Sequence, residues 1–429
     1  MRAMVYLLVL MLCMTLSSAS EYVLGVFGNA NMDENIDSKD ITYLEGVIRG
    51  TNAATRFCDA NYDGKIDADD IDQIEKIIRG DNTELTVLDL ADRAVTIKTP
   101  VERIVLVASR NIQEFVAVGG GKDFIKKVVG WGPELKASDK DTYEKYSERF
   151  PELEEIPDVG SPGKGTFSTE KVISLKPDVV IFPTWLIGSV DDDIEKIEQV
   201  GIPSIYLDHY VYDDFAESTL LLGKILDNDV RAQELVKYHQ DQEDKVLSRL
   251  KSISAPVPKV YAECGNLGPS EYSNSFGKGI AWDRVIEKCR GINIIDDMSK
   301  ANMWPVISPE YLLKQNPDVI IITGSHWPAV TDSMRLGYYA DPDDSKGRLE
   351  TFTKRHGWDT LSAIKRDRVY SIYHTLPDRI YKFAALQAVA KCLYPEEFKD
   401  LDPENSIKEF HEKFLPVDYS GIWMVSLEE

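Results

Sequence analysis

A stretch of 14 residues occurs twice in this chain, at positions 168–181 and again at 308–321. Each copy opens with Ser, has Glu two residues later, and closes with Pro-Asp followed by three aliphatic residues. A Ser N-cap, a proline that cannot continue a helix and a buried aliphatic run predict a short capped helix followed by a strand. Because the copies lie 140 residues apart, they predict two similar lobes.

The residues around these copies alternate between strand and helix patterns. The aliphatic run at 104–107 predicts another buried strand, and the alternation favours parallel sheets with flanking helices. Residues 230–253 predict a helix that spans about 35 Å, which is long enough to cross both lobes. We therefore predict an α/β fold with two Rossmann-like lobes, at 86–228 and 256–429, joined by a long helix within 229–255.

A second repeat, with an offset of 30 residues, lies near the start of the chain. Each copy places side-chain oxygens at positions 1, 3, 5, 9 and 12 of a loop, and the backbone carbonyl of position 7 adds another. A hard cation such as Ca²⁺ needs six or more oxygen ligands arranged in this way. The predicted calcium ligands are Asn29, Asn31, Asp33, Asn35, Asp37 and Asp40 in the first loop, and Asp59, Asn61, Asp63, Lys65, Asp67 and Asp70 in the second.

Each loop runs into a short helix, so we expect a small all-α, EF-hand-type domain over residues 25–80. This duplicated loop and helix resembles the dockerin family, in which each loop closes with Asp, as at Asp40 and Asp70. The resemblance implies calcium-dependent folding and docking to a cohesin partner. Asn29 stands where the family has Asp, and Glu34 where it has Gly, so we expect two calcium sites of which the first is weaker. The family's partner-contact positions correspond to Ser38, Lys39, Ala68 and Asp69.

The remainder of the chain, from about residue 86 to 415, resembles the helix-bridged periplasmic-binding family that receives iron-siderophores, haem and cobalamin. Residues 175–181 match its commonest signature, and 368–370 match its last strand. The resemblance implies a class III periplasmic binding fold, with the ligand held between the lobes by side chains at the strand C-termini. It further implies delivery of the ligand to an ABC permease, with no catalytic residues.

In that family a glutamate from each lobe meets arginines on the transporter. Glu170 and Glu310 occupy those positions and are the predicted permease-docking residues. A Glu in the first turn also stabilises its own helix by about 0.3–1 kcal/mol, which is the alternative reason for its presence.

Aromatic and basic residues follow several predicted strands, where a ligand between the lobes would meet them. Large planar chelates favour aromatic walls, and anionic chelates favour arginine. We expect an iron-siderophore as the ligand, with haem or a corrinoid such as cobalamin as alternatives. The predicted ligand-binding residues are Arg110, Trp185, Tyr210, Tyr272, Trp304, His326, Trp327 and Arg379.

Residues 1–20 have the features of a secretory signal peptide: Arg2, an apolar stretch at 5–16, and small residues before Glu21. We therefore expect an exported monomer at the cell surface or in the extracytoplasmic space; a retained N-terminal anchor is the alternative. The formal net charge of -23 disfavours nucleic acid and anionic lipid as partners. In an exported protein Cys264 and Cys289 are the one pair to test for a disulfide, and buried free thiols fit equally well.

Two other classes of function fit parts of these patterns. Two Rossmann-like lobes around a cleft also occur in the metal chelatases of tetrapyrrole synthesis, although those enzymes lack an export signal. A structural or assembly protein, with cohesin docking as its main activity, is the second alternative.

Overall fold

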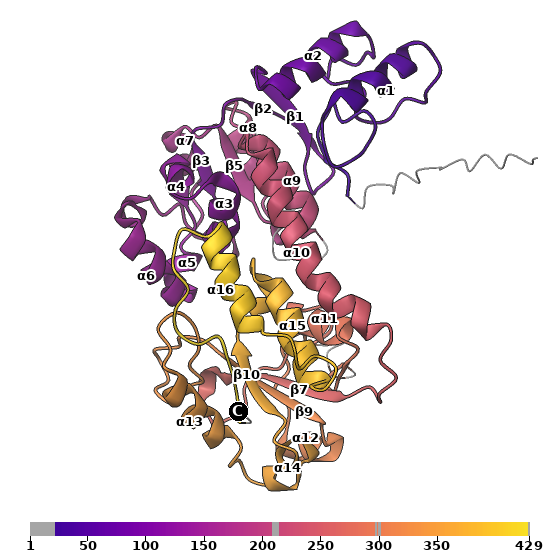
Figure 1. Ribbon diagram of the computed structural model, residues 1–429. Coiled ribbons are helices and arrows are strands. Elements are labelled where there is room, and N and C mark those ends of the chain that lie inside the picture. The colour runs from indigo at the N-terminus through magenta and orange to yellow at the C-terminus, as the bar shows by residue number, and fades with distance from the viewer. Residues whose placement is uncertain (1–21, 208–213, 297, 299–301, 428–429) are drawn as a thin grey trace, which may run out of the picture.

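The computed structural model describes residues 22–207, 214–296, 298 and 302–427 (Figure 1). The signal peptide predicted at 1–20 lies outside these ranges. Two mainly parallel sheets form the centres of two lobes, and the predicted α/β architecture is confirmed. The two copies of the 14-residue repeat lie in different sheets, with β5 (Val179–Phe182) in one and β9 (Val319–Gly324) in the other.

The N-terminal lobe, shown above in Figure 1, has a four-stranded parallel sheet in the order β4-β3-β5-β6. The other strands of this sheet are β3 (Ile104–Leu106), β4 (Val128–Trp131) and β6 (Ser204–Tyr206). Its helices are α3 (Ile112–Gly119), α4 (Lys122–Lys127), α5 (Glu134–Ser138), α6 (Lys140–Arg149), α7 (Thr169–Leu175), α8 (Asp191–Glu198) and α9 (Phe215–Ile225).

The C-terminal lobe has a five-stranded sheet in the order β11-β10-β9-β7-β8, parallel except for the edge strand β11. The other strands are β7 (Lys259–Cys264), β8 (Ile292–Asn293), β10 (Val369–Tyr373) and β11 (Met424–Ser426). Its helices are α11 (Ala281–Lys288), α12 (Pro309–Gln315), α13 (Pro342–Phe352), α14 (Ser362–Lys365), α15 (Lys382–Leu393) and α16 (Pro403–Phe414).

The repeated Ser and Asp residues have the same structural roles in both lobes. Ser168 and Ser308 cap α7 and α12 by accepting a backbone N–H three residues on, each at 3.2 Å. The carboxylate of Asp178 accepts the backbone N–H groups of residues 102 and 103 at 2.8 Å, and that of Asp318 accepts the N–H of Lys259 at 2.9 Å. Each Asp therefore joins its own strand to the start of the neighbouring one.

The long helix predicted between the lobes is α10 (Asp229–Leu250), which packs on α9 of one lobe and α15 of the other. A second connection was not predicted: α16 runs back along α10 toward the N-terminal lobe (Figure 1). The Tyr238 ring of α10 packs against Phe410 and Phe414 of α16 at centroid distances of 5.6 and 5.4 Å. The chain after α16 then contacts the N-terminal lobe, where Lys145 donates to Ser420 at 3.1 Å.

The N-terminal region contains α1 (Ser38–Ile48) and α2 (Ala68–Arg79), each preceded by one of the two predicted loops. A hairpin of β1 (Glu84–Leu88) and β2 (Ala94–Lys98) comes next and connects this region to the N-terminal lobe. The four cysteines of the described residues are buried free thiols: Cys58, Cys264, Cys289 and Cys392. The candidate disulfide between Cys264 and Cys289 is therefore absent from the structure. Across the described residues, no helix combines the length and the apolar character that crossing a bilayer requires.

Candidate functional site

His374, directly after β10, marks where the two lobes meet. Its ring interacts electrostatically with Arg110, which follows β3 of the N-terminal lobe, and with Asp378 and Arg379 of its own lobe. Burial, helped by the two arginines and opposed by Asp378, lowers the pKa of His374 to about 4. The imidazole is therefore neutral at pH 7, and its Nδ1 atom lies 2.9 Å from Oγ1 of Thr323.

Two short segments from opposite lobes bring buried polar atoms to this place. Several of these atoms have no hydrogen-bond partner within the described protein: Nε of Arg110, Oδ1 of Asn111, both carboxylate oxygens of Glu114, Oγ1 of Thr375 and Oδ1 of Asp378. Buried polar groups normally have partners, so such a concentration indicates a place where a polar ligand completes the hydrogen bonding.

The carboxyl group of Glu114 belongs to a residue that is only 1% exposed. Burial raises the pKa of its carboxyl group to about 8, although the positive charges of Arg379 and Lys382 act in the opposite direction. Arg379 is 1% exposed, and its Nε atom lies 4.0 Å from a carboxylate oxygen of Asp139. The interface between the lobes therefore contains both positive and negative groups held away from water.

Aromatic rings lie on the C-terminal-lobe side of His374. Trp327 approaches it edge-on at 5.3 Å, and Phe276 lies 5.8 Å away. Phe276 in turn contacts Trp304, which is 45% exposed, at 5.9 Å. Trp304 and Trp327, both predicted as ligand-binding residues, thus belong to one aromatic cluster, together with Phe276, which the sequence did not single out.

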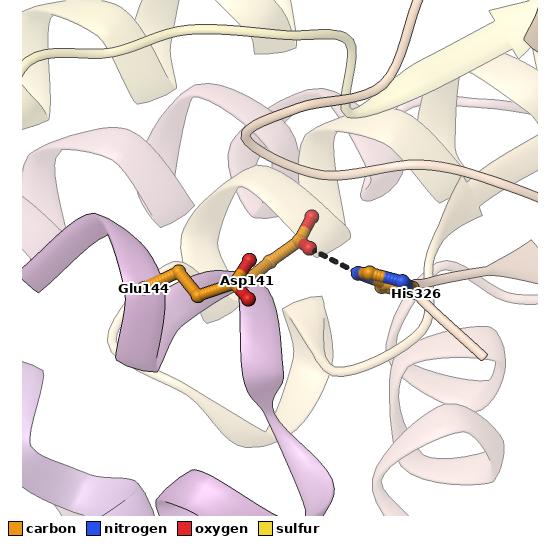
Figure 2. A group of neighbouring side chains, drawn as sticks. All are labelled: Asp141, Glu144 and His326. Atoms are coloured by element: carbon orange, nitrogen blue, oxygen red, sulfur yellow. Dashed lines mark hydrogen bonds and ion pairs between the residues drawn. The ribbon is translucent and has the colours of Figure 1, made fainter. Parts of the chain in front are cut away.

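A second contact between the lobes involves Asp141 of α6 (Figure 2). Its buried carboxylate accepts a hydrogen bond from the Arg335 guanidinium at 3.0 Å and lies 2.8 Å from Nδ1 of His326. Ligand atoms of Asp141, Glu144 and His326 lie within 4.8 Å of one another, a spacing that a metal ion could bridge. Arg335 also lies 2.9 Å from the other Asp141 oxygen, so the protein itself already neutralises this carboxylate. We therefore interpret the group as an ionic bridge between the lobes.

Further inter-lobe hydrogen bonds surround this bridge. Gln113 of α3 donates to the Tyr381 hydroxyl at 2.9 Å, and Tyr381 lies 3.1 Å from the hydroxyl of Tyr338. Tyr373 of β10 donates to Asp139 at 3.3 Å. These partners are far apart in sequence, and no local pattern could have identified them.

The predicted ligand-binding residues fall into three groups. Arg110, His326, Trp327 and Arg379 lie at the lobe interface, and Trp304 lies beside it. Trp185 is 54% exposed on the N-terminal lobe, beside Gly163. Tyr272 packs inside the C-terminal lobe, where it accepts the Trp358 indole N–H at 2.7 Å and lies against Arg355. Tyr210 falls outside the described residues.

The predicted docking residues, Glu170 and Glu310, are both exposed in the first turns of α7 and α12. Glu170 lies 3.4 Å from its N-cap serine hydroxyl. Hydrogen bonds from its own backbone and from Ser308 lower the pKa of Glu310. Both carboxylates therefore serve their helix ends and also remain accessible to a partner.

The two N-terminal loops close in the same way. The Asp40 carboxylate accepts backbone N–H groups from Asn31 at 3.1 Å and Asp37 at 2.8 Å, and Asp70 accepts the equivalent pair at 3.2 and 2.8 Å. Burial raises the pKa of Asp40 to about 6 and also raises that of Asp70. Buried carboxylates among other oxygen donors fit a hard divalent cation, which would favour their charged forms.

Comparison with known proteins identifies relatives of the two lobes. The periplasmic binding protein family matches residues 120–375. The uncharacterized ABC transporter substrate-binding lipoprotein YvrC of Bacillus subtilis is 25% identical over 320 residues, which are 74% of this chain and 87% of that protein. The molybdate-binding protein MolA of Haemophilus influenzae is 21% identical over 360 residues, 78% of this chain and 91% of that protein.

Among solved structures, the TroA-like periplasmic binding protein FepB from Veillonella parvula is 37% identical, with a TM-score of 0.76. The match covers 80% of this chain and 99% of that structure. The family match begins at residue 120, after both of the N-terminal loops.

Proposed function

The chain belongs to the periplasmic binding protein family, and on that premise we propose that it is the extracytoplasmic substrate-binding protein of an ABC importer. It holds its ligand between the lobes and delivers it without chemical change. The observation that carries this proposal is the set of buried, unmatched polar atoms that residues 110–114 and 375–378 bring together from opposite lobes.

The ligand we propose is an anionic metal chelate, with an iron-siderophore first and haem or cobalamin as alternatives. Arg110 and Arg379 supply positive charge at the interface, and Trp304 and Trp327 supply flat apolar surface beside it. Glu114 holds a proton up to a pH of about 8, so it can donate a hydrogen bond to an oxygen of the chelate at neutral pH.

Titration of the purified chain tests the function and the ligand class together. A ferric catecholate siderophore, haem, cyanocobalamin and molybdate are each added while tryptophan fluorescence and calorimetric heat are recorded. We expect tight saturable binding of one chelate, and Arg110→Gln should weaken it at least about tenfold because a charge-assisted hydrogen bond is lost. Arg366→Gln, a variant of a 64% exposed arginine, is the matched control and should bind as the native protein does. Equal loss in both variants would contradict the assigned site.

We further propose that Glu170 and Glu310 contact the permease. Their exposure, and their equivalent positions on α7 and α12, support this role. A first-turn carboxylate can stabilise its own helix whether or not it is exposed. Docking on a partner that contacts both lobes requires an exposed carboxylate on each lobe, which both glutamates provide.

A second function is proposed for the N-terminal loops, namely binding of two calcium ions. The matching hydrogen bonds to Asp40 and Asp70 support it. The resemblance also suggests docking of a cohesin partner, and the exposure of the contact positions Ser38, Lys39, Ala68 and Asp69 supports it. Calorimetry with Ca²⁺ should count two ions, and Mg²⁺ at the same concentration should not replace them.

A further inference from the structure

The segment that leads into the first calcium-type loop packs against the core of the lobes. Leu24 and Val26, just before it, are 4% and 0% exposed and belong to the main hydrophobic core of the lobes. The same segment pairs with β1, where the Leu88 N–H donates to the Gly25 carbonyl at 2.8 Å. The second loop meets this segment through the Tyr62 ring, which packs on Phe27 at 4.7 Å, and residues 61–66 are all exposed.

Asn29 shows how the first loop is attached. In both loops the Oδ1 atom of the opening residue accepts the backbone N–H at loop position 5, at 3.2 and 3.0 Å. The second side-chain atom differs between them. Asp59 Oδ2 accepts from Gly64 at 2.9 Å, whereas Asn29 Nδ2 donates to the carbonyls of Leu24 at 2.8 Å and Asp33 at 2.6 Å. An aspartate cannot donate, so asparagine is the residue that ties this loop to the segment before it.

The inter-lobe helix provides the other attachment. The side-chain amide of Gln233 on α10 donates to Oδ1 of Asn35, at position 7 of the first loop. Residues 34–37 of the loop, together with Leu220, Lys224 and Asp229, line a cavity of about 300 Å³ around this contact. The first loop therefore touches the element that joins the two lobes.

We propose that the first loop acts as a clamp on the ligand-binding domain: calcium held there stabilises the N-terminal lobe and the start of α10 through Asn29 and Gln233. Calcium in the second loop acts on the lobes less directly, because the hydrogen bonds of Asp59 stay within that loop. The proposal rests on the calcium binding proposed above. Calcium binds the ordered loop and not the unfolded chain, so it stabilises the native state. The contacts of Asn29 and Gln233 depend on the ordered loop and are stabilised together with it.

Tryptophan fluorescence separates the two effects. All seven tryptophans lie between residues 131 and 423, so thermal unfolding followed by their fluorescence reports on the lobes alone. Calcium should raise this unfolding midpoint in the native full chain relative to EDTA. Asp40→Asn, which disables the first loop, should remove most of the rise, and the matched Asp70→Asn in the second loop should retain it.

Gln233→Ala tests the attachment while leaving the loop residues intact. Calorimetry should still count two calcium ions, but the calcium-induced rise of the tryptophan midpoint should shrink; Gln240→Ala on the same helix is the control and should behave as native. Equal effects of Asp40→Asn and Asp70→Asn, or two bound ions with no shift of the tryptophan midpoint, would overturn the clamp and leave calcium binding standing. Absence of any calcium binding would overturn both proposals.

Discussion

The two lobes contain the same helix-strand unit but differ in the residues that come after it. Both helices end at a residue in the left-handed conformation, Lys176 at φ 49° and Asn316 at φ 46°. Beyond β5 the chain leads to the exposed Trp185, whereas beyond β9 it leads to the half-buried His326 and Trp327. The repeated unit therefore supplies a scaffold, and the proposed binding surface depends on the residues after each strand.

The two arginines of the interface differ between the lobes as well. Arg379 is 1% exposed, while Arg110 from the other lobe is only partly buried. A group fixed in place before binding loses less conformational entropy when a ligand arrives. Variants of residues in both lobes test whether this difference in burial matters, and they are given in the order of their expected effect on the free energy of unfolding.

The largest loss is expected from removing Arg379. Arg379→Met withdraws positive charge from the buried carboxylate of Asp139, and an uncompensated buried charge costs about 3–5 kcal/mol. Arg110→Met should cost less than about 1.5 kcal/mol, since its site is partly solvated. Urea unfolding followed by tryptophan fluorescence measures both. Equal losses would show that the deeper burial of Arg379 makes no difference to stability.

A smaller loss is expected from breaking the bridge between the lobes. Asp141→Asn loses charge-assisted hydrogen bonds with Arg335 and His326, for a cost of about 1.5–3 kcal/mol. Glu144→Gln, one turn along α6, should change the free energy of unfolding by no more than about 0.5 kcal/mol. If the two variants are indistinguishable in urea unfolding, Asp141 does not fasten the lobes.

The pH dependence of stability should reveal Glu114. Because its pKa is raised to about 8 in the folded protein, the native state keeps a proton that the unfolded chain loses near its ordinary pKa of 4.5. Stability from this group is complete below 4.5 and falls as pH rises toward 8. His374, with its pKa lowered to about 4, acts in the opposite direction only below about pH 6.5.

Glu114→Gln should therefore reduce the fall in the free energy of unfolding between pH 6.5 and 8 by at least about 1 kcal/mol, since one pKa unit corresponds to about 1.4 kcal/mol. Urea midpoints at a series of pH values provide the measurement. A native-like slope in the variant would assign the decline to other groups.

The smallest stability effect is expected at the docking residues. Glu170→Gln and Glu310→Gln should each change the free energy of unfolding by less than about 0.5 kcal/mol and leave ligand affinity unchanged. Uptake by cells that carry the cognate permease should nevertheless fall, most strongly in the double variant. The exposed Glu195→Gln on α8 is the control. Unimpaired uptake in the double variant would show that both residues only stabilise their own helices.

The sequence predicted the features that depend on neighbours in the chain. The repeated Ser and Asp residues, the strands after them and the long helix all appear where local patterns placed them, because capping and hydrophobic periodicity act over a few residues. The inter-lobe contacts depend on distant pairs instead. Asp141 meets His326 across 185 positions, and Gln113 meets Tyr381 across 268. Polar residues of this kind look like ordinary surface residues in a sequence, and only the folded chain shows their partners.

The same limit explains Tyr272 and Glu114. Tyr272 follows a strand and is aromatic, as a ligand-contacting residue would be, but its hydroxyl is used by Trp358. Glu114 lies beside Gln113 in a helix whose other residues are apolar or glycine, and a carboxyl group in such a helix was the available signal in the sequence that a polar neighbour must exist.

The return of α16 along α10 has a mechanical consequence. A single helix between two lobes allows them to twist about the helix axis. A second helix packed beside the first, as α16 is packed beside α10, resists that rotation. The polypeptide crosses between the lobes through α10, again through α16, and once more on its way to β11. The two lobes are therefore expected to keep nearly the same relative orientation with and without the proposed ligand.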